Sequence, residues 1–170
     1  AKDIATMSTK QGASTITQQL IKNSILEKTW ISESSLIESV QRKVQEQYLA
    51  VKLEQQVSKK WILEEYLNTI NLGANTLGVQ AASERYFGKD VSELTLSECA
   101  VIAGITKNPY GYNPIRFPEK NKERQTEVLT KMKEQGYISQ AEYDEAVEDP
   151  VYERISEHNA IEEKSVNLYY

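Results

Sequence analysis

Residues 36–56 read Leu-Ile-Glu-Ser-Val-Gln-Arg-Lys-Val-Gln-Glu-Gln-Tyr-Leu-Ala-Val-Lys-Leu-Glu-Gln-Gln, a stretch without glycine or proline. Apolar residues recur in it every three or four positions, which is the period of an α-helix. This apolar stripe consists of Ile37, Val40, Val44, Tyr48 and Val51. The opposite side is mixed and consists of Arg42, Glu46, Leu49, Ala50 and Leu53. A helix with apolar residues on both sides is typically central, so we predict a long central helix here.

The rest of the chain predicts further helices and no strand. Apolar spacing and capping residues place these helices at about 15–27, 59–68, 79–86, 98–105, 118–135 and 139–148. Cys99 lies in the apolar helix at 98–105, and we expect it in the core. From Pro150 onward the helical pattern weakens. We therefore predict an all-α domain over residues 1–149, followed by a linker or the start of another domain over 150–170.

Composition narrows the classes of function. The chain has 170 residues, is 39% hydrophobic and carries a net charge of −5, which is ordinary for one globular domain with a short tail. The acidic balance argues against bulk nucleic-acid binding. A single cysteine excludes an internal disulfide, and no Cys/His cluster has metal-ligand spacing. The longest apolar runs are far shorter than a membrane span.

The stretch at 12–23, Gly-Ala-Ser-Thr-Ile-Thr-Gln-Gln-Leu-Ile-Lys-Asn, places hydroxyls, amides and a cation at one helix start. Thr15 and Gln18 have the spacing of a capping box. Gln18 and Lys22 are four residues apart and share a helix face. Ser14 lies near the helix N-terminus, where free N–H groups favour an anion. We predict a phosphate or pyrophosphate site, with a well-capped polar surface helix as the alternative.

Glu46 is the strongest candidate for catalysis. Arg42 lies one turn before it and Lys43 lies three residues before it. A partly desolvated carboxylate beside a cation is a candidate for general acid or base work on sugars. The alternative is an exposed ion pair that stabilises the helix only slightly. Lys89, which follows a predicted helix end, is either an anion ligand or an ordinary C-terminal lysine.

Taken together, these segments resemble the family-51 peptidoglycan glycosyltransferases, which are the polymerase modules of class A penicillin-binding proteins and of monofunctional transglycosylases. Residues 12–23 are similar to the second motif of that family. Residues 42–54 match its third motif, Arg-Lys-x-x-Glu-x-x-x-Ala-x-x-Leu-Glu. Residues 60–89 and 96–114 are similar to the fourth and fifth motifs. Four motifs in the same order make the resemblance specific, and it covers about residues 10–148.

The resemblance implies an all-α, lysozyme-like fold that polymerises lipid II into glycan strands and releases undecaprenyl diphosphate. Glu46 then corresponds to the second catalytic glutamate, which supports the departing diphosphate directly or through a divalent cation, Mg²⁺ or Mn²⁺. No other cofactor and no metal-binding residues are implied. The residues implied to bind substrate and pyrophosphate are Ser14, Thr15, Thr17, Gln18, Gln19, Lys22, Asn23, Arg42, Lys43 and Lys89.

One motif of the family has no counterpart. The first motif, Glu-Asp-x-x-Phe-x-x-His-x-Gly, supplies the acceptor-side base and should precede Gly12, but nothing there matches it. We therefore expect an N-terminally truncated module that is inactive by itself. The implied partners of the parent are lipid II, the growing glycan strand, the bacterial membrane through an N-terminal anchor, and a transpeptidase domain after residue 150.

The parent would then act in cell wall biogenesis at the outer face of the bacterial cytoplasmic membrane. Two other functions compete with this prediction. The first is a lysozyme-like enzyme that cleaves finished glycan, and the second is a non-catalytic helical binding fragment. The polar string at 12–23 argues against glycan cleavage, which needs no diphosphate site.

Overall fold

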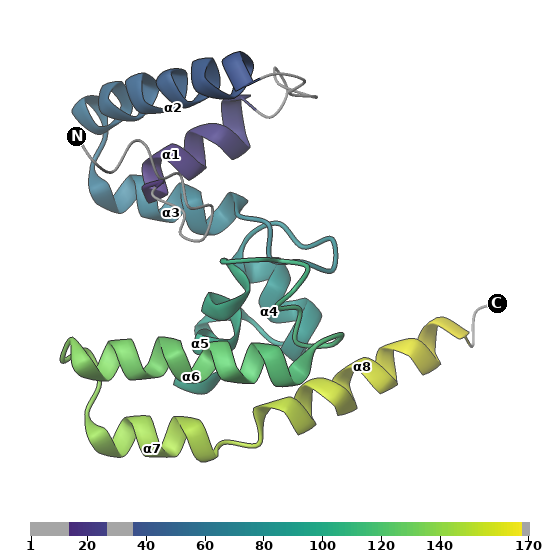
Figure 1. Cartoon of the computed structure of the whole chain (residues 1–170). Helices are drawn as coiled ribbons and strands as arrows, with labels where there is room; N and C mark the ends of the chain where they lie inside the picture. The colour runs from purple at the N-terminus through teal and green to yellow at the C-terminus, as the bar shows by residue number, and fades with distance from the viewer. Residues whose placement is uncertain (1–13, 27–35, 168–170) are drawn as a thin grey trace. The chain divides into compact units, whose positions relative to one another are not determined.

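The computed structural model describes residues 14–26 and 36–167, and it divides the chain into two compact units (Figure 1). Unit 1 comprises residues 1–69 and unit 2 comprises residues 70–170. The described residues form helices joined by turns, and their only β pairing is an isolated bridge between Asn71 and Leu77. The all-α prediction is confirmed. Across the described ranges, none of the helices combines the length and apolarity that a membrane crossing requires.

Unit 1 is built around its first helix. Helix α1 (Ile16–Ile21) continues into the π-helical turn η1 (Lys22–Leu26), and it contacts both α2 (Leu36–Gln56) and α3 (Lys59–Thr69). The predicted capping box is present, because the Gln18 N–H donates to Thr15 Oγ1 and the Thr15 N–H donates to Gln18 Oε1. The apolar core between these helices includes Leu20, Ile21, Leu26, Ala50, Ile62 and Tyr66.

Helix α2 is not buried on both sides, which corrects the prediction of a central helix. Its apolar stripe is exposed, with exposed fractions from 58% at Val51 to 70% at Ile37. The mixed side is the buried one, where Glu46 is 1% and Ala50 is 5% exposed. Because α1 packs against α2, the small and polar residues of α2 take the inward position. Helical spacing alone therefore identified two faces without showing which one is covered.

Unit 2 is centred on α5 (Leu96–Ile105), which contacts α4 (Val79–Phe87), α6 (Pro118–Glu134) and α7 (Gln140–Glu148). A short 3-10 turn, η2 (Val91–Glu93), connects α4 to α5. Helices α6 and α7 form the antiparallel pair drawn in green in Figure 1. One cluster of its core consists of Ala100, Leu129, Ile138 and Ala146.

Most of the segment at 150–170, expected to be a linker or the start of another domain, forms a helix. Helix α8 (Val151–Asn167) packs against α4, and Val151 and Ile155 are buried together with Val101. These buried positions are four residues apart, but the charged residues between them weaken the pattern in the sequence. The domain boundary at residue 149 remains a prediction. Cys99 is exposed, so its placement in the core was wrong.

Candidate functional site

Glu46 lies in the interface between α1 and α2 and is the centre of the candidate site. Its side chain is 1% exposed, and Arg42 donates to its Oε1 atom while Lys43 Nζ lies 2.6 Å from its Oε2 atom. Both cations come from the same helix, three and four residues before Glu46, so the helical repeat alone aligns them. The alternative of an exposed surface ion pair is excluded by this burial.

The cluster of Arg42, Lys43 and Glu46 carries one net positive charge, because two cations pair with one carboxylate. Lys43 is 46% exposed, so its ammonium group reaches from buried Glu46 toward solvent. Lys43 Nζ also donates to Ser14 Oγ at 3.4 Å, which links the start of α1 to the cluster. The structure therefore brings together Ser14, Arg42, Lys43 and Glu46, which were predicted from two separate motifs. A partly exposed ammonium next to a helix start is suited to bind an anion.

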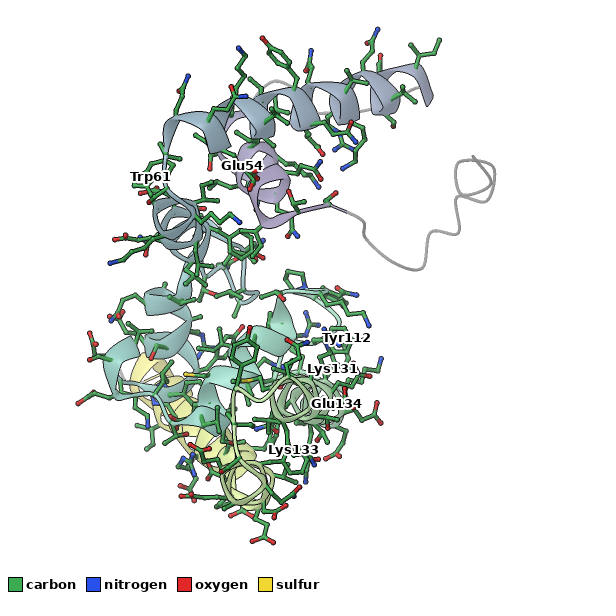
Figure 2. The ribbon with its side chains drawn as sticks, turned by 90° about the vertical axis from the view of Figure 1, so that its left-hand side faces the viewer. Glu54, Trp61, Tyr112, Lys131, Lys133 and Glu134 are labelled. Atoms are coloured by element: carbon green, nitrogen blue, oxygen red, sulfur yellow. The ribbon has the colours of Figure 1, made fainter. Side chains whose placement is uncertain are left out.

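Several other predicted side chains of α1 have partners within unit 1. Thr17 is buried and its hydroxyl donates to Glu54 Oε1 at 2.6 Å; Figure 2 labels Glu54 on α2. The Tyr66 hydroxyl donates to Gln19 Oε1 at 3.4 Å. Burial raises the pKa of Tyr66, which keeps its phenol protonated as a donor. Thr17 and Gln19 therefore hold α1 against α2 and α3.

The remaining predicted residues are Lys22 and Asn23, which lie in unit 1, and Lys89, which lies in unit 2. Lys22 is exposed and Asn23 is half-buried, both in the π-helical turn after α1. Lys89 lies in unit 2, where its Nζ atom is 2.8 Å from Oε2 of fully buried Glu98. An ammonium held by a buried carboxylate has a structural role in unit 2. Its predicted contact with an anion stays a prediction.

Sequence reasoning did not identify Glu98 as a charged centre. Its carboxylate accepts from the Thr95 N–H at 2.9 Å and pairs with Lys89 and Arg154. Burial pushes the pKa of Glu98 upward, but these hydrogen bonds outweigh burial and hold its pKa below the usual value. The Thr-x-x-Glu capping spacing was the signal available in the sequence, yet it does not reveal two distant cations.

Among the described residues, the side chains alone do not form a site that fits a divalent cation. Within the described ranges, no group of three or more His, Cys, Asp or Glu side chains could hold a metal ion. Both carboxylate oxygens of Glu46 already accept from cationic side chains. These residues therefore do not hold a metal ion by themselves.

Comparison with known families matches residues 1–133 to the family model described as transglycosylase. The chain belongs to the transglycosylase family. Transglycosylase relatives include penicillin-binding protein 1A of Clostridium novyi, 51% identical over 78% of this chain, and that of Haemophilus influenzae, 48% identical over 83%. The Aquifex aeolicus protein of the same name is 45% identical over 83% of the chain.

A solved structure agrees with this assignment. The crystal structure of penicillin-binding protein 1A from Haemophilus influenzae is similar with a TM-score of 0.54 and 47% sequence identity. That match covers 56% of this transglycosylase chain and 14% of the solved chain. The chain spans 16–18% of the length of the three relatives named above. The family and the helical fold are therefore established.

Proposed function

We propose that the parent of this chain is a peptidoglycan glycosyltransferase that polymerises lipid II and releases undecaprenyl diphosphate. The observation that carries the proposal is buried Glu46 held between Arg42 and Lys43, with Ser14 at hydrogen-bonding distance from Lys43. Family membership over residues 1–133 supports glycosyl transfer as the reaction class. The proposed partners are lipid II, the growing glycan strand, the membrane, and a transpeptidase domain of the parent. The parent itself acts at the outer face of the cytoplasmic membrane.

The proposed reaction follows from the charges at the site. The acceptor hydroxyl oxygen forms a bond to the anomeric carbon of the donor sugar. The bond from that carbon to the diphosphate breaks, and its electron pair leaves with the diphosphate oxygen. The acceptor proton passes to the base that the family resemblance places in the first motif. Preorganised cations such as Lys43 stabilise the charge that develops on the leaving diphosphate.

Glu46 acts at the leaving-group side in this proposal. Because its two oxygens accept from Arg42 and Lys43, it fixes both cations before the diphosphate arrives. The protein needs no reorganisation at the moment of bond cleavage if these groups are already in place. A divalent cation, Mg²⁺ or Mn²⁺, would be held by the diphosphate itself.

The test is Glu46→Gln in the full-length parent, assayed with lipid II by the length of the glycan product. We expect polymerisation to fall about 10²-fold or more, because groups of this kind contribute roughly 10²–10⁴-fold. Glu123→Gln, at an exposed glutamate of α6 outside the four motifs, is the matched control and should leave the rate unchanged. Glu46→Asp tests position, since it keeps the charge but shortens the side chain.

Two results separate this proposal from its competitors. Glycan cleavage by the parent without polymer formation would favour the lysozyme-like enzyme. Polymerisation by Glu46→Gln within twofold of the unchanged protein would refute the role of Glu46. Equal helicity and melting temperature of the variants would exclude misfolding as the cause of any loss.

A further inference from the structure

Residues 85–89, Arg-Tyr-Phe-Gly-Lys, form the end of α4 and the turn after it, and they belong to the segment that resembles the fourth motif. Helix α8, drawn in yellow in Figure 1, packs against α4, although it lies outside the residues 1–133 that the family model matches. Phe87 packs against the buried cluster to which α8 contributes Val151 and Ile155. Three further contacts from α8 converge on the same five residues.

The first contact orients a guanidinium. Arg85 donates through Nη1 to Oδ1 of Asn159, a side chain that is 6% exposed. The amide nitrogen of Asn159 donates to the Ile155 carbonyl oxygen at 2.7 Å. Because this bond to its own helix uses the amide nitrogen, the amide oxygen is the atom that Asn159 presents to Arg85. Asn159 therefore transmits the position of α8 to Arg85.

The second contact is between a ring and the backbone. Gly88 caps α4 with a φ of +69°, and its N–H donates to the Glu84 carbonyl oxygen at 2.9 Å. A Cβ on Gly88 would lie 2.7 Å from Cε1 and 2.9 Å from Nδ1 of His158. Glycine thus serves both the turn and the close approach of α8. Helix α8 therefore packs directly on the backbone at the point where α4 ends.

The third contact passes through a buried carboxylate. Lys89 Nζ lies 2.8 Å from Oε2 of Glu98, and Nη2 of Arg154 in α8 lies 3.2 Å from Oε1. The backbone of Lys89 is also held, because its carbonyl oxygen accepts from Ser83 Oγ at 2.7 Å. Each oxygen of Glu98 faces one cation, so Arg154 prevents Glu98 from turning both oxygens toward Lys89. Arg154 therefore determines how Glu98 holds the Lys89 ammonium.

Both cations of the segment line pockets of unit 2. Arg85 lines a pocket of about 890 Å³ together with the loops at 71–77 and 108–116. Lys89 lines a second pocket, of about 520 Å³, with residues from the start of α5 and from α7. Volumes of this size are typical of ligand sites. A shift of α8 would therefore move a cation in each pocket.

We propose that Asn159 and Arg154 of α8 are positioning residues for the transglycosylase reaction, and that they set the places of Arg85 and Lys89 at the two pockets. Each residue acts on the substrate through one cation of the segment 85–89. That the substrate is lipid II rests on the proposed function. Helix α8 is then part of the catalytic module and not a connection that follows it.

The first experiment measures amide hydrogen exchange in the 170-residue chain by NMR and needs no substrate. Asn159→Leu and Asn159→Asp both remove the donor to Ile155, but only Asn159→Asp keeps an oxygen that accepts from Arg85. We expect exchange at residues 85–89 to quicken about tenfold in Asn159→Leu and to stay within about twofold in Asn159→Asp. Amides of α5 should exchange at unchanged rates in both variants. Quickening that spreads evenly over unit 2 would make Asn159 a merely structural residue and overturn the proposal.

The second experiment measures kcat and KM of the full-length parent with lipid II. A cation that is no longer held binds an anionic substrate less well, so Asn159→Leu should raise KM about tenfold with little change in kcat, and Asn159→Asp should restore KM. Under the proposed function Glu46→Gln lowers kcat instead, so the two proposals fail separately. Glu157→Gln, at an exposed position of α8, is the control and should change neither constant. An unchanged KM in Asn159→Leu, or equal losses in both Asn159 variants, would refute the positioning role.

Arg154 supplies an independent pair of variants. Arg154→Gln removes the cation at Oε1 of Glu98, whereas Arg154→Lys keeps a positive charge there. We expect Arg154→Gln to raise KM about tenfold and to quicken exchange at Lys89, and Arg154→Lys to restore both. Because Arg154 is 40% exposed, this pair decides the question if Asn159→Leu does not fold. Equal KM values for Arg154→Gln and the unchanged parent would contradict the proposal.

Discussion

At the scale of single residues, burial distinguishes Glu46 from other paired carboxylates of the chain. The Lys131–Glu134 pair of α6 has the same spacing as Lys43–Glu46, but both of its side chains are more than half exposed. Such a surface pair contributes about 0–1 kcal/mol. Removing one partner of a buried pair is far more costly, because a charge remains without compensation. The same local motif therefore has different consequences at the two sites.

Lys22 provides a test of the predicted diphosphate site. Lys22→Ala in the parent should weaken a pyrophosphate-bearing phosphoglycolipid inhibitor, because a hydrogen bond to a charged group contributes about 1.5–3 kcal/mol. Isothermal titration calorimetry gives the affinity. Lys52→Ala, which removes a cation beside Tyr48 on the exposed stripe of α2, is the control and should bind as the unchanged protein does. If Lys22→Ala binds the inhibitor as tightly as Lys52→Ala does, Lys22 is not part of the diphosphate site.

At the scale of elements, α2 shows an unusual distribution of side chains. The helix buries a charged cluster and a small residue against α1, and it exposes five large apolar or aromatic side chains. A buried Ala50 lets the two helices approach closely, whereas Val44 makes no comparable contribution to the core of unit 1. The functional cluster and the helix packing therefore occupy the same face.

Two substitutions in α2 test this assignment of faces. Val44→Ser should change the free energy of unfolding by no more than about 0.5 kcal/mol, as for surface sites. Ala50→Leu should destabilise by about 1–3 kcal/mol, because it adds volume to a packed interface. Urea unfolding followed by circular dichroism measures both. A larger loss from Val44→Ser than from Ala50→Leu would show that the apolar stripe is the buried face.

At the scale of the whole molecule, Glu98 connects distant parts of unit 2. Lys89 follows α4, Thr95 caps α5, and Arg154 lies in α8, and all three contact the Glu98 carboxylate. Arg154 also pairs with Asp149, and its hydrogen bonds hold the pKa of Asp149 below the usual value. One ion network therefore joins helices that are separated by more than fifty residues.

This network predicts a loss of stability in acid. Unfolded Glu98 titrates near its ordinary pKa of 4.5, and the folded pKa is lower, so protonation favours the unfolded chain. The contribution is complete above pH 4.5 and is lost as the pH falls through the folded pKa. Glu98→Gln should cost roughly 1.5–3 kcal/mol at pH 7 and flatten this acid dependence. Urea midpoints between pH 3 and 7 measure both; an unchanged profile in Glu98→Gln would contradict the assignment.

The sequence by itself determined the family and the helices other than α8. Caps such as Thr15 with Gln18 act over one turn, so the start of α1 could be predicted from four residues. The ranges predicted for α2, α3 and α4 agree with the structure to within one residue at each end. Glu46, Arg42 and Lys43 could be grouped in advance because a helix places residues three and four apart on one face.

Only the tertiary structure decided which faces are covered and which distant groups meet. The exposed stripe of α2, the pairing of Lys89 with Glu98, and the packing of α8 each depend on contacts between separate helices. The pocket near Arg116 arises because Gly73 and Pro109, 36 residues apart, approach each other. Periodicity describes one helix at a time, and the free energy of burial depends on what packs against that helix.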